Sequence, residues 1–167
     1  MKKIPTALSL WAALSFAFFV LPGAQAATVT NQFKVTITVQ PSCIFVTTPI
    51  TDMNFGAVAA DATNVTAATS FKMQCTIGTA PQISLTSANS WTMVGVDSGA
   101  PYDNTAAFIP YGLFSDSARS VSWAGTTGAP AVLNDGSEQN LDVYGKVADV
   151  GKTVGAFSDT VTITLTF

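Results

Sequence analysis

Hydrophobic and polar residues alternate with a period of two along much of the chain beyond residue 30. The clearest stretches are 33–39, 83–86, 141–147 and 161–167, where mostly polar residues separate apolar or small residues. Such alternation is typical of β-strands with one buried face. No helical period is sustained after residue 30, so the pattern predicts an all-β domain.

Turn-forming residues divide this pattern into short segments. Residues 78–81 and 125–130 begin with Gly and end with Pro, and residues 151–155 begin and end with Gly. Short strands with regular turn signals between them predict a β-sandwich or a β-barrel. We expect the longest loops at residues 97–107 and 124–140, and one domain without internal repeats.

The first 26 residues have a different pattern, typical of a secretory signal peptide. Lys2 and Lys3 precede an apolar stretch over residues 8–21, and Ala24-Gln25-Ala26 supplies the small residues that a signal peptidase requires. A membrane anchor is the alternative, but the apolar stretch is short for a span. We predict cleavage after Ala26, export of the chain, and no membrane span after the signal is removed.

The two cysteines fit an exported protein. Cys43 and Cys75 lie 32 positions apart, and an even number of cysteines in an exported chain predicts a disulfide. A metal site or a catalytic thiol would be the alternatives. The chain has no histidine and no Cys-x-x-Cys motif, so both alternatives lack their usual partners. We expect no metal and no cofactor.

Charge and motif content argue against catalysis and against nucleic acid. The 10 acidic residues outnumber the 7 Lys and Arg, and no basic cluster occurs. Without histidine a Ser-His-Asp triad cannot form, and the carboxylates are mostly isolated along the chain. No Gly-rich phosphate loop is present. The sequence therefore predicts that the protein is not an enzyme and binds no nucleic acid.

The two ends of the predicted domain carry apolar rows that a partner could cover. Residues 28–39 could form a first strand of the sandwich, or a segment with its apolar row available to another chain. Residues 161–167 could be an ordinary core strand or a sheet edge kept for β-augmentation, in which a foreign strand joins a sheet. Pairing of one molecule's first segment with another molecule's last strand would use both rows.

Several short motifs occur in a recognisable order. They are a short N-terminal strand leading to Cys43, Phe55-Gly56, Phe71 to Cys75, Tyr111 to Asp116 followed by Arg119 and Trp123, Val143 to Val147, and Gly155 to Val161. Each is weak alone, but the order behind a signal peptide is specific. Together they make the chain resemble the spore coat U domain family, which includes the pilins of archaic chaperone–usher pathways. The resemblance covers nearly all of the chain after the signal.

The resemblance implies an incomplete immunoglobulin-like β-sandwich completed by donor-strand exchange. Its domains would be a signal peptide at 1–26, a donor segment at 27–40 that runs into the first strand, and a sandwich at 41–167. Lys146 stands where the family commonly has Arg, and Phe114 and Phe157 stand where it commonly has Tyr. The penultimate Tyr of classical pilins is replaced by Thr166, which favours the archaic branch.

Residue roles follow from the resemblance together with the two apolar rows. The expected donor residues are Val29, Phe33, Val35 and Ile37. The expected accepting edge, which would also contact a chaperone, consists of Val161, Ile163, Leu165 and Phe167. Trp123, Tyr144 and Phe157 are expected to be core aromatics.

The implied function is that of a structural pilin subunit of a fimbria, polymerising for surface attachment and biofilm formation. Its partners would be a periplasmic chaperone, an outer-membrane usher and identical or related subunits, and it would reach the cell surface through the periplasm. Three alternatives stay open: a non-filamentous coat protein of the same family, a secreted carbohydrate-binding sandwich, and a hydrolase with an unrecognised carboxylate pair.

Overall fold

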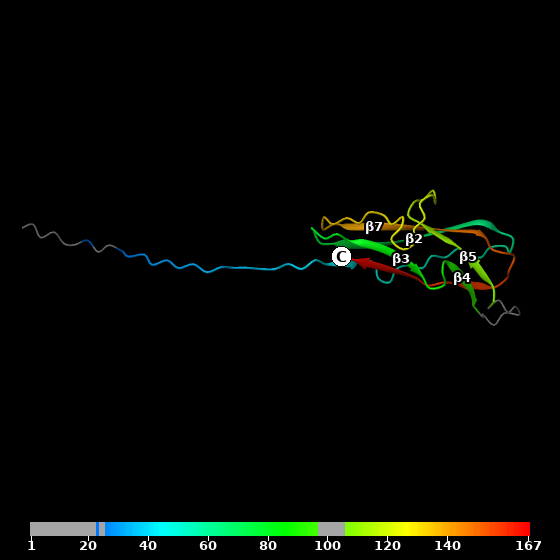
Figure 1. The fold of residues 1–167 in the computed structure, drawn as a ribbon, viewed down its shortest axis with the longest axis horizontal. Helices are drawn as coiled ribbons and strands as arrows, with labels where there is room; N and C mark the ends of the chain where they lie inside the picture. The colour runs from blue at the N-terminus through cyan, green and yellow to red at the C-terminus, as the bar shows by residue number, and fades with distance from the viewer. Residues whose placement is uncertain (1–22, 24–25, 97–105) are drawn as a thin grey trace, which may run out of the picture. The chain divides into compact units, whose positions relative to one another are not determined.

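A computed structural model describes residue 23 and residues 26–96 and 106–167 (Figure 1). The predicted signal peptide therefore lies almost entirely outside the described residues. Within them the chain forms strands and no helix, which confirms the all-β prediction. The strands are β1 (Cys43–Phe45), β2 (Thr63–Cys75), β3 (Gln82–Ser87), β4 (Thr92–Val96), β5 (Phe108–Pro110), β6 (Gly112–Phe114), β7 (Glu138–Asp149), β8 (Ala156–Ser158) and β9 (Val161–Thr166).

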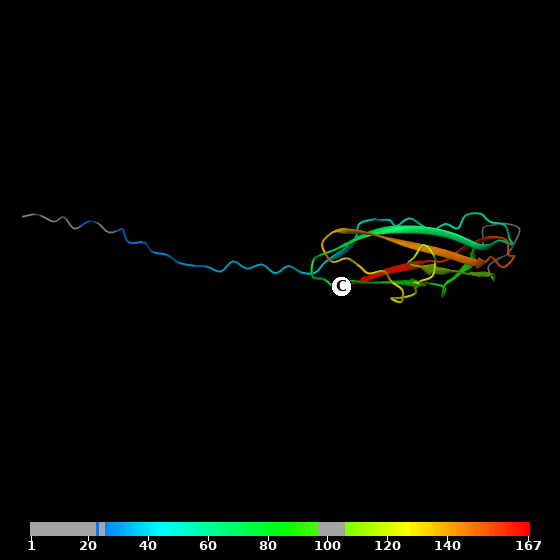
Figure 2. The ribbon, with the colours of Figure 1, turned by 90° about the horizontal axis from the view of Figure 1, so that it is seen from above.

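One layer of the sandwich is an antiparallel sheet with the strand order β1-β2-β7-β6. The long pair β2 and β7 forms its centre and runs in register from Thr63 opposite Asp149 to Gln74 opposite Glu138. In the C-terminal half of β2 the buried side chains alternate with outward ones, so this sheet presents one apolar face to the core. Figure 2 shows this pair as the upper layer.

The other layer is formed by β3 with β9 and by β4 with β5 and β8. Because β4 follows β3 and β9 follows β8 after short breaks, the two small sheets succeed one another along the same layer (Figure 2). A hydrogen bond from the Ala88 amide to the Thr160 carbonyl, 2.9 Å long, links the two breaks. This layer contains β9, which pairs with β3 on one side and with no described strand on the other.

The core lies between the layers and has two parts. The larger part surrounds Trp123, which is completely buried, and includes Phe71, Leu85 and Val143. The smaller part consists of Ile109, Val147 and Val150. Trp123 confirms the expectation of a core aromatic. Its indole nitrogen is the one buried side-chain polar atom without a hydrogen-bond partner in the described part of the chain.

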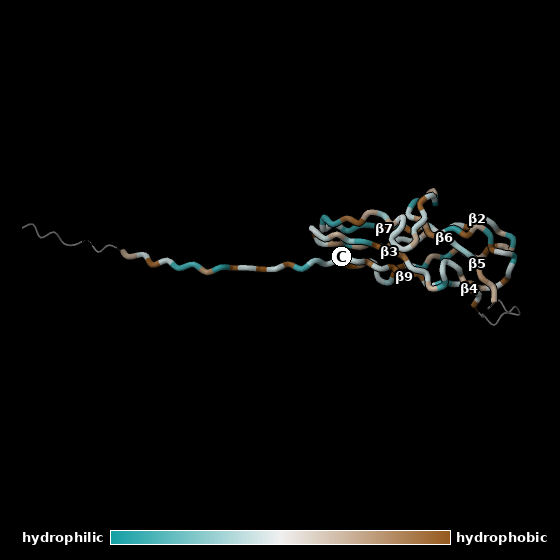
Figure 3. Tube along the Cα trace, viewed as in Figure 1, coloured by the Kyte–Doolittle hydropathy of each residue, from teal (hydrophilic) through white to brown (hydrophobic). Residues whose placement is uncertain are grey.

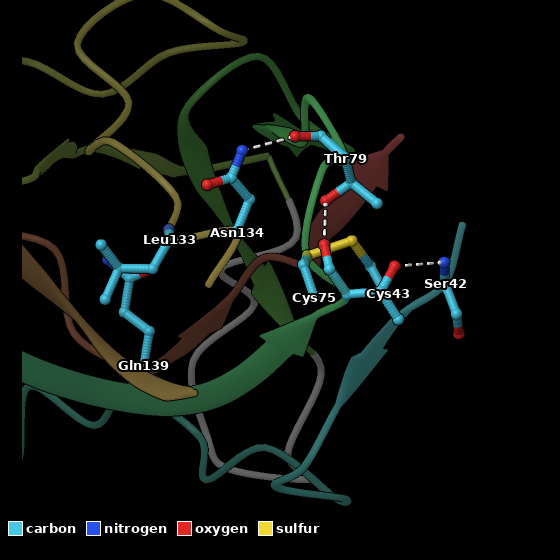
Figure 4. The surroundings of a disulfide bond; sticks show 8 residues. Ser42, Cys43, Cys75, Thr79, Leu133, Asn134 and Gln139 are labelled. Carbon is cyan, nitrogen blue, oxygen red and sulfur yellow. Dashed lines mark hydrogen bonds between the residues drawn. A yellow bond between two sulfur atoms is a disulfide. The ribbon is translucent and has the colours of Figure 1, made fainter. Parts of the chain in front are cut away.

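The predicted disulfide is confirmed. Cys43 of β1 lies directly opposite Cys75 of β2, their Cα atoms are 4.1 Å apart, and their sulfurs are bonded (Figure 4). Nearby, the Asn134 side chain donates a 2.6 Å hydrogen bond to the Thr79 carbonyl, which attaches the loop before β7 to the turn before β3. The bridge therefore anchors β1 at the end of the domain where the N-terminal segment joins it.

Three of the four strands expected from alternation are present. Residues 83–86, 141–147 and 161–166 lie in β3, β7 and β9. The expected strand at 33–39 is wrong for the isolated chain, because those residues pair with no strand and β1 begins at Cys43. An apolar row alone does not make a strand where no neighbouring strand accepts its hydrogen bonds.

Candidate functional site

The backbone of β9 directs half of its hydrogen-bonding groups toward an edge without a partner strand. On β3, the Leu85 amide and carbonyl are bonded to Gly125 at 3.1 Å and 2.9 Å, although Leu85 lies opposite Ile163 of β9. The β3–β9 ladder must therefore use the even-numbered residues of β9. The N–H and C=O groups of Val161 and Ile163 point the other way, where no described strand pairs with β9.

A groove lies beside this edge. Its first part has a volume of about 620 Å³, and its floor includes the buried core residues Leu85, Leu113 and Val143. One wall is formed by β8, β9 and the break between them. The other wall is formed by Phe45 of β1 and by the irregular segment that follows it, whose apolar members are Ile50, Met53 and Phe55. The core is thus open along one side of the sandwich.

The groove continues toward the beginning of β8. A second hollow of about 580 Å³ shares Met53, Phe55, Met93 and Phe157 with the first. Its lining includes Val147 and Val150 of the smaller core and extends along residues 153–157. On the side of the last strands, the groove therefore runs from Thr153 to Ile163, a length that an extended segment of about ten residues would fill.

The residues expected to form the accepting edge occupy different positions along it. Val161 and Ile163 line the groove and are only half-buried, although their side chains face the core. Leu165 also packs against the core but does not line the groove. Phe167 lies beyond the end of β9 and is 53% exposed. The groove thus includes the first half of the predicted edge and extends further, past Phe157.

A polar cluster interrupts the apolar wall at the break between β8 and β9. The Asp159 carboxylate accepts hydrogen bonds from Ser87 (2.5 Å), from Tyr111 (2.6 Å), and from the Asn89 amide and side chain. It also accepts one from the Thr160 amide. Asp159 and Tyr111 both line the groove, so a polar site lies among otherwise apolar contacts.

Burial and these hydrogen bonds shift the pKa values of the two ionisable groups in opposite directions. Burial raises the pKa of the Tyr111 hydroxyl well above its usual 10.0, and the hydrogen bond to Asp159 adds to this shift. Burial opposes ionisation of Asp159, but the hydrogen bonds from Ser87, Tyr111, Thr160 and Asn89 outweigh it and lower the pKa of that carboxyl below 3.8. At neutral pH the cluster is a carboxylate beside a neutral phenol, whose proton is directed at the carboxylate.

Gly145 of β7 explains how the irregular wall lies so close to the sheet. A Cβ at this position would come within 2.3 Å of the Met53 sulfur and 2.8 Å of a Phe55 ring carbon. Met53 and Phe55 thus occupy the space that the side chain of any residue other than glycine at position 145 would need. The Gly145 carbonyl also accepts a 3.1 Å hydrogen bond from Arg119, whose guanidinium lies over the Tyr144 ring at 5.8 Å.

The expected donor residues lie in a segment that takes part in no strand. Val29, Phe33, Val35 and Ile37 are 93%, 88%, 81% and 87% exposed. Figure 3 shows hydrophobic and hydrophilic positions following one another along this stretch. Four large apolar side chains at odd-numbered positions, with Lys34 and Thr36 between them, would form one apolar face if the segment became extended.

Sequence reasoning placed some aromatic residues correctly and missed others. Tyr144 is not a core aromatic, because it belongs to neither core cluster and contacts Arg119 on the outer side of β7. Phe157 packs against the smaller core and also lines the groove. Of the wall residues 50–58, only Phe55-Gly56 was noted, as a motif, because the segment forms no strand and shows no period. Tyr111 and Asp159 were noted only as motif members, since their contact spans 48 positions.

Within the described residues, no group of three or more His, Cys, Asp or Glu side chains lies close enough to hold a metal ion. The same part of the chain contains no helix of the length and apolarity that crossing a membrane would need.

Comparison with solved structures supports the fold. The crystal structure of the CsuC-CsuE chaperone–tip adhesion subunit pre-assembly complex, from archaic chaperone-usher Csu pili of Acinetobacter baumannii, matches with a TM-score of 0.51 and 24% sequence identity. The match covers 78% of this chain and 40% of the matched chain, so this chain corresponds to less than half of that protein's length. At this identity the match shows a shared fold, an incomplete immunoglobulin-like sandwich.

Comparison of sequences identifies the family. No curated protein matches the chain significantly. The family profile of the Spore Coat Protein U domain, in contrast, matches residues 29–164, which include every described strand except the last residues of β9. The chain is therefore a member of the spore coat protein U domain family.

Proposed function

We propose that this protein is a structural subunit of a surface fibre of the chaperone–usher type, joined head to tail by donor-strand complementation. In this assembly, the donor segment 27–40 of one subunit supplies the strand that fills the groove of the next. The observation that carries the proposal is the groove itself, which exposes core residues next to the unpaired backbone edge of Val161 and Ile163. Family membership and the shared fold support the same assignment.

Occupation of the groove by a strand is energetically favourable. An unpaired strand edge above an exposed apolar core promotes aggregation, and proteins normally cover or blunt such edges. An incoming strand gains ladder hydrogen bonds and buries apolar side chains. Each fully buried Val, Ile or Phe contributes about 1.5–3 kcal/mol before the cost of ordering the segment. Four such residues contribute about 6–12 kcal/mol, and the ladder hydrogen bonds add to this. Because the groove is already formed, only the incoming segment has to be ordered.

The same groove explains the need for a partner before assembly. A periplasmic chaperone would cover the edge of β9 until an outer-membrane usher replaced it with the segment of the next subunit. A head-to-tail contact that does not close produces a filament. Surface attachment and biofilm formation would follow from such a filament on the cell surface.

The test places one negative charge inside the proposed interface and the same charge outside it. Val35→Asp puts a carboxylate on the apolar row, whereas Thr36→Asp puts it on the opposite row of the same segment. We expect both variants to be exported and to bind a chaperone, and only the Thr36→Asp subunit to polymerise, as seen by electron microscopy and size-exclusion chromatography. Normal fibres from Val35→Asp, or a stable wild-type monomer without a chaperone, would refute the proposal. Assemblies without fibres would favour the coat-protein alternative.

A further inference from the structure

We propose that Asn31 sets the register in which the segment of one subunit enters the groove of the next, by pairing with the Tyr111–Asp159 cluster. This inference rests on the donor-strand function proposed above. Asn31 would then fix which residues of the incoming segment lie opposite which residues of the groove. This role would account for the presence of a polar side chain in an otherwise apolar row.

The direction of the incoming segment follows from the topology. The chain enters β1 at Cys43, at the same end of the domain as the end of β9, because Cys43 lies opposite Cys75 and Gln82 lies opposite Thr166. In a head-to-tail row every copy has the same orientation. A segment that leaves this end enters the neighbour at the start of β8 and runs antiparallel to β8 and β9.

Polar matching selects one register. The inward row of the segment consists of Val29, Asn31, Phe33, Val35 and Ile37, with one polar member. The inward row of β8 and β9 also has one polar member among its half-buried residues, Asp159, between Phe157 and Val161. Placing Asn31 opposite Asp159 sets Val29 opposite Val161 and Phe33 opposite Phe157.

The extent of the groove fits the same register. The wall of the groove runs from Thr153 to Ile163 along the last strands. With Asn31 opposite Asp159, these residues face Ile37 at one end and Ala27 at the other. Ala27 is the first residue after the predicted cleavage site, so the segment would end where the groove ends. Residues 38–42 remain as the connection between successive subunits.

The cluster has an acceptor available for Asn31. The Asp159 carboxylate already receives five hydrogen bonds, about as many as its lone pairs accommodate. The Tyr111 hydroxyl donates its proton to Asp159, and Ser87 takes up at most one lone pair of its oxygen, so the other lone pair stays available. The Asn31 side-chain amide carries N–H groups that can donate to the Tyr111 oxygen. Its carbonyl presently accepts only from the neighbouring Gln32 amide, a local bond of 2.8 Å.

Neighbouring registers are disfavoured because they separate the polar groups. A shift of two residues places Phe33 over the Asp159 cluster and Asn31 against Val161. A shift of four places Val35 over the cluster and Asn31 against Ile163. Either shift leaves the amide among apolar side chains without a partner, which disfavours that register by roughly ten- to a hundredfold.

Cysteine cross-linking in the assembled fibre tests the register. Thr162 is outward-facing in β9, and its backbone belongs to the β3 ladder, so its partner on the incoming strand lies at the closer, non-hydrogen-bonded spacing. We expect Thr28→Cys/Thr162→Cys to give a covalent ladder on a non-reducing gel after mild oxidation. Thr30→Cys/Thr162→Cys and Gln32→Cys/Thr162→Cys should give none, because diagonal neighbours exceed the span of a disulfide.

A second cysteine pair tests the register further from the N-terminal end of the segment, where fraying cannot prevent the cross-link. Gln32→Cys/Ser158→Cys reports the same register in β8 and should also give a ladder, whereas Lys34→Cys/Ser158→Cys should not. Single-cysteine variants should give no ladder. A ladder from a shifted pair in place of these two would overturn the register but keep the donor-strand function. Fibres without a ladder from any pair would also overturn the register. A cross-link confined to monomers would overturn both the register and the donor-strand function.

Substitution of Asn31 tests its positioning role. Asn31→Leu should spread cross-linking over the shifted pairs and reduce the Thr28–Thr162 ladder by tenfold or more. Tyr111→Phe should act similarly, because it removes the free acceptor. Gln32→Leu, on the outward row, should leave the ladder unchanged. A single unshifted register in the Asn31→Leu fibre would show that Asn31 does not set it.

Discussion

The Tyr111 hydroxyl donates a 2.6 Å hydrogen bond to the Asp159 carboxylate, joining the segment before β6 to the break between β8 and β9. Asp159→Ala removes the acceptor shared by Tyr111, Ser87 and Asn89. We expect a loss of about 1–3 kcal/mol in the free energy of unfolding, because partly buried donors are left without a partner. Urea unfolding followed by tryptophan fluorescence measures this loss. Asp61→Ala, an exposed carboxylate without a hydrogen bond described here, should change it by less than about 0.5 kcal/mol.

The lowered pKa of Asp159 predicts an acid-sensitive contribution to stability. Because the folded pKa lies below the unfolded value of 3.8, the ionised group stabilises the fold above that value, and this contribution is lost as the pH falls through the folded pKa. The difference in unfolding free energy between wild type and Asp159→Asn should be constant from about pH 7 to about pH 5 and shrink below about pH 4.

Other acidic groups do not disturb this comparison. Hydrogen bonds from the Val121 amide and from Ser120 lower the pKa of Asp116, and bonds from Ser137 lower the pKa of Asp135. Both groups titrate in the same acid range, but they are present in both proteins and cancel in the difference. A difference that grew toward low pH would contradict the assigned direction of the Asp159 shift.

The parts of the fold that could be predicted from sequence are those encoded by local alternation. β3, β7 and β9 repeat apolar residues at every second position, and the pairing of Cys43 with Cys75 needed only the count of cysteines and the signal peptide. The first half of β2 was missed, because Thr63 to Ser70 is rich in small and polar residues that occur equally often in loops.

The groove could be predicted only in part, because it depends on distant contacts. Val161 and Ile163 stand out as an alternating row, but the opposite wall is a segment without a period that is positioned by Gly145. The contact between Tyr111 and Asp159 joins residues that no local pattern relates. Apolar alternation identified residues 33–39 as strand-forming, but it could not show that no described strand pairs with them in the isolated chain.

The close approach at Gly145 gives a test of the groove wall. Gly145→Ala places a methyl group within 2.3 Å of the Met53 sulfur, so Met53 and Phe55 must move. We expect destabilisation of about 1–3 kcal/mol, typical of overpacking, and slower fibre formation because the displaced wall narrows the groove. Gly112→Ala is the matched control, since its methyl would meet only the Phe114 ring, at 3.1 Å. Equal effects of both substitutions on assembly would argue against a role for the wall.

Removing the disulfide should release β1 and one wall of the groove together. Cys43→Ser opens the bond between β1 and β2, and loop-closure arithmetic for the 32-position separation gives a loss of roughly 3–4 kcal/mol. Because Phe45 of β1 lines the groove two residues further on, strand capture should weaken along with stability. The unfolding midpoint and the fibre yield measure the two effects. Cys43→Ser leaves Cys75 as a free thiol, so Cys43→Ser/Cys75→Ser is the control. The double variant should be as unstable as the single variant if the lost cross-link alone is responsible. A double variant as stable as wild type would show that β1 is held by its pairing with β2 instead.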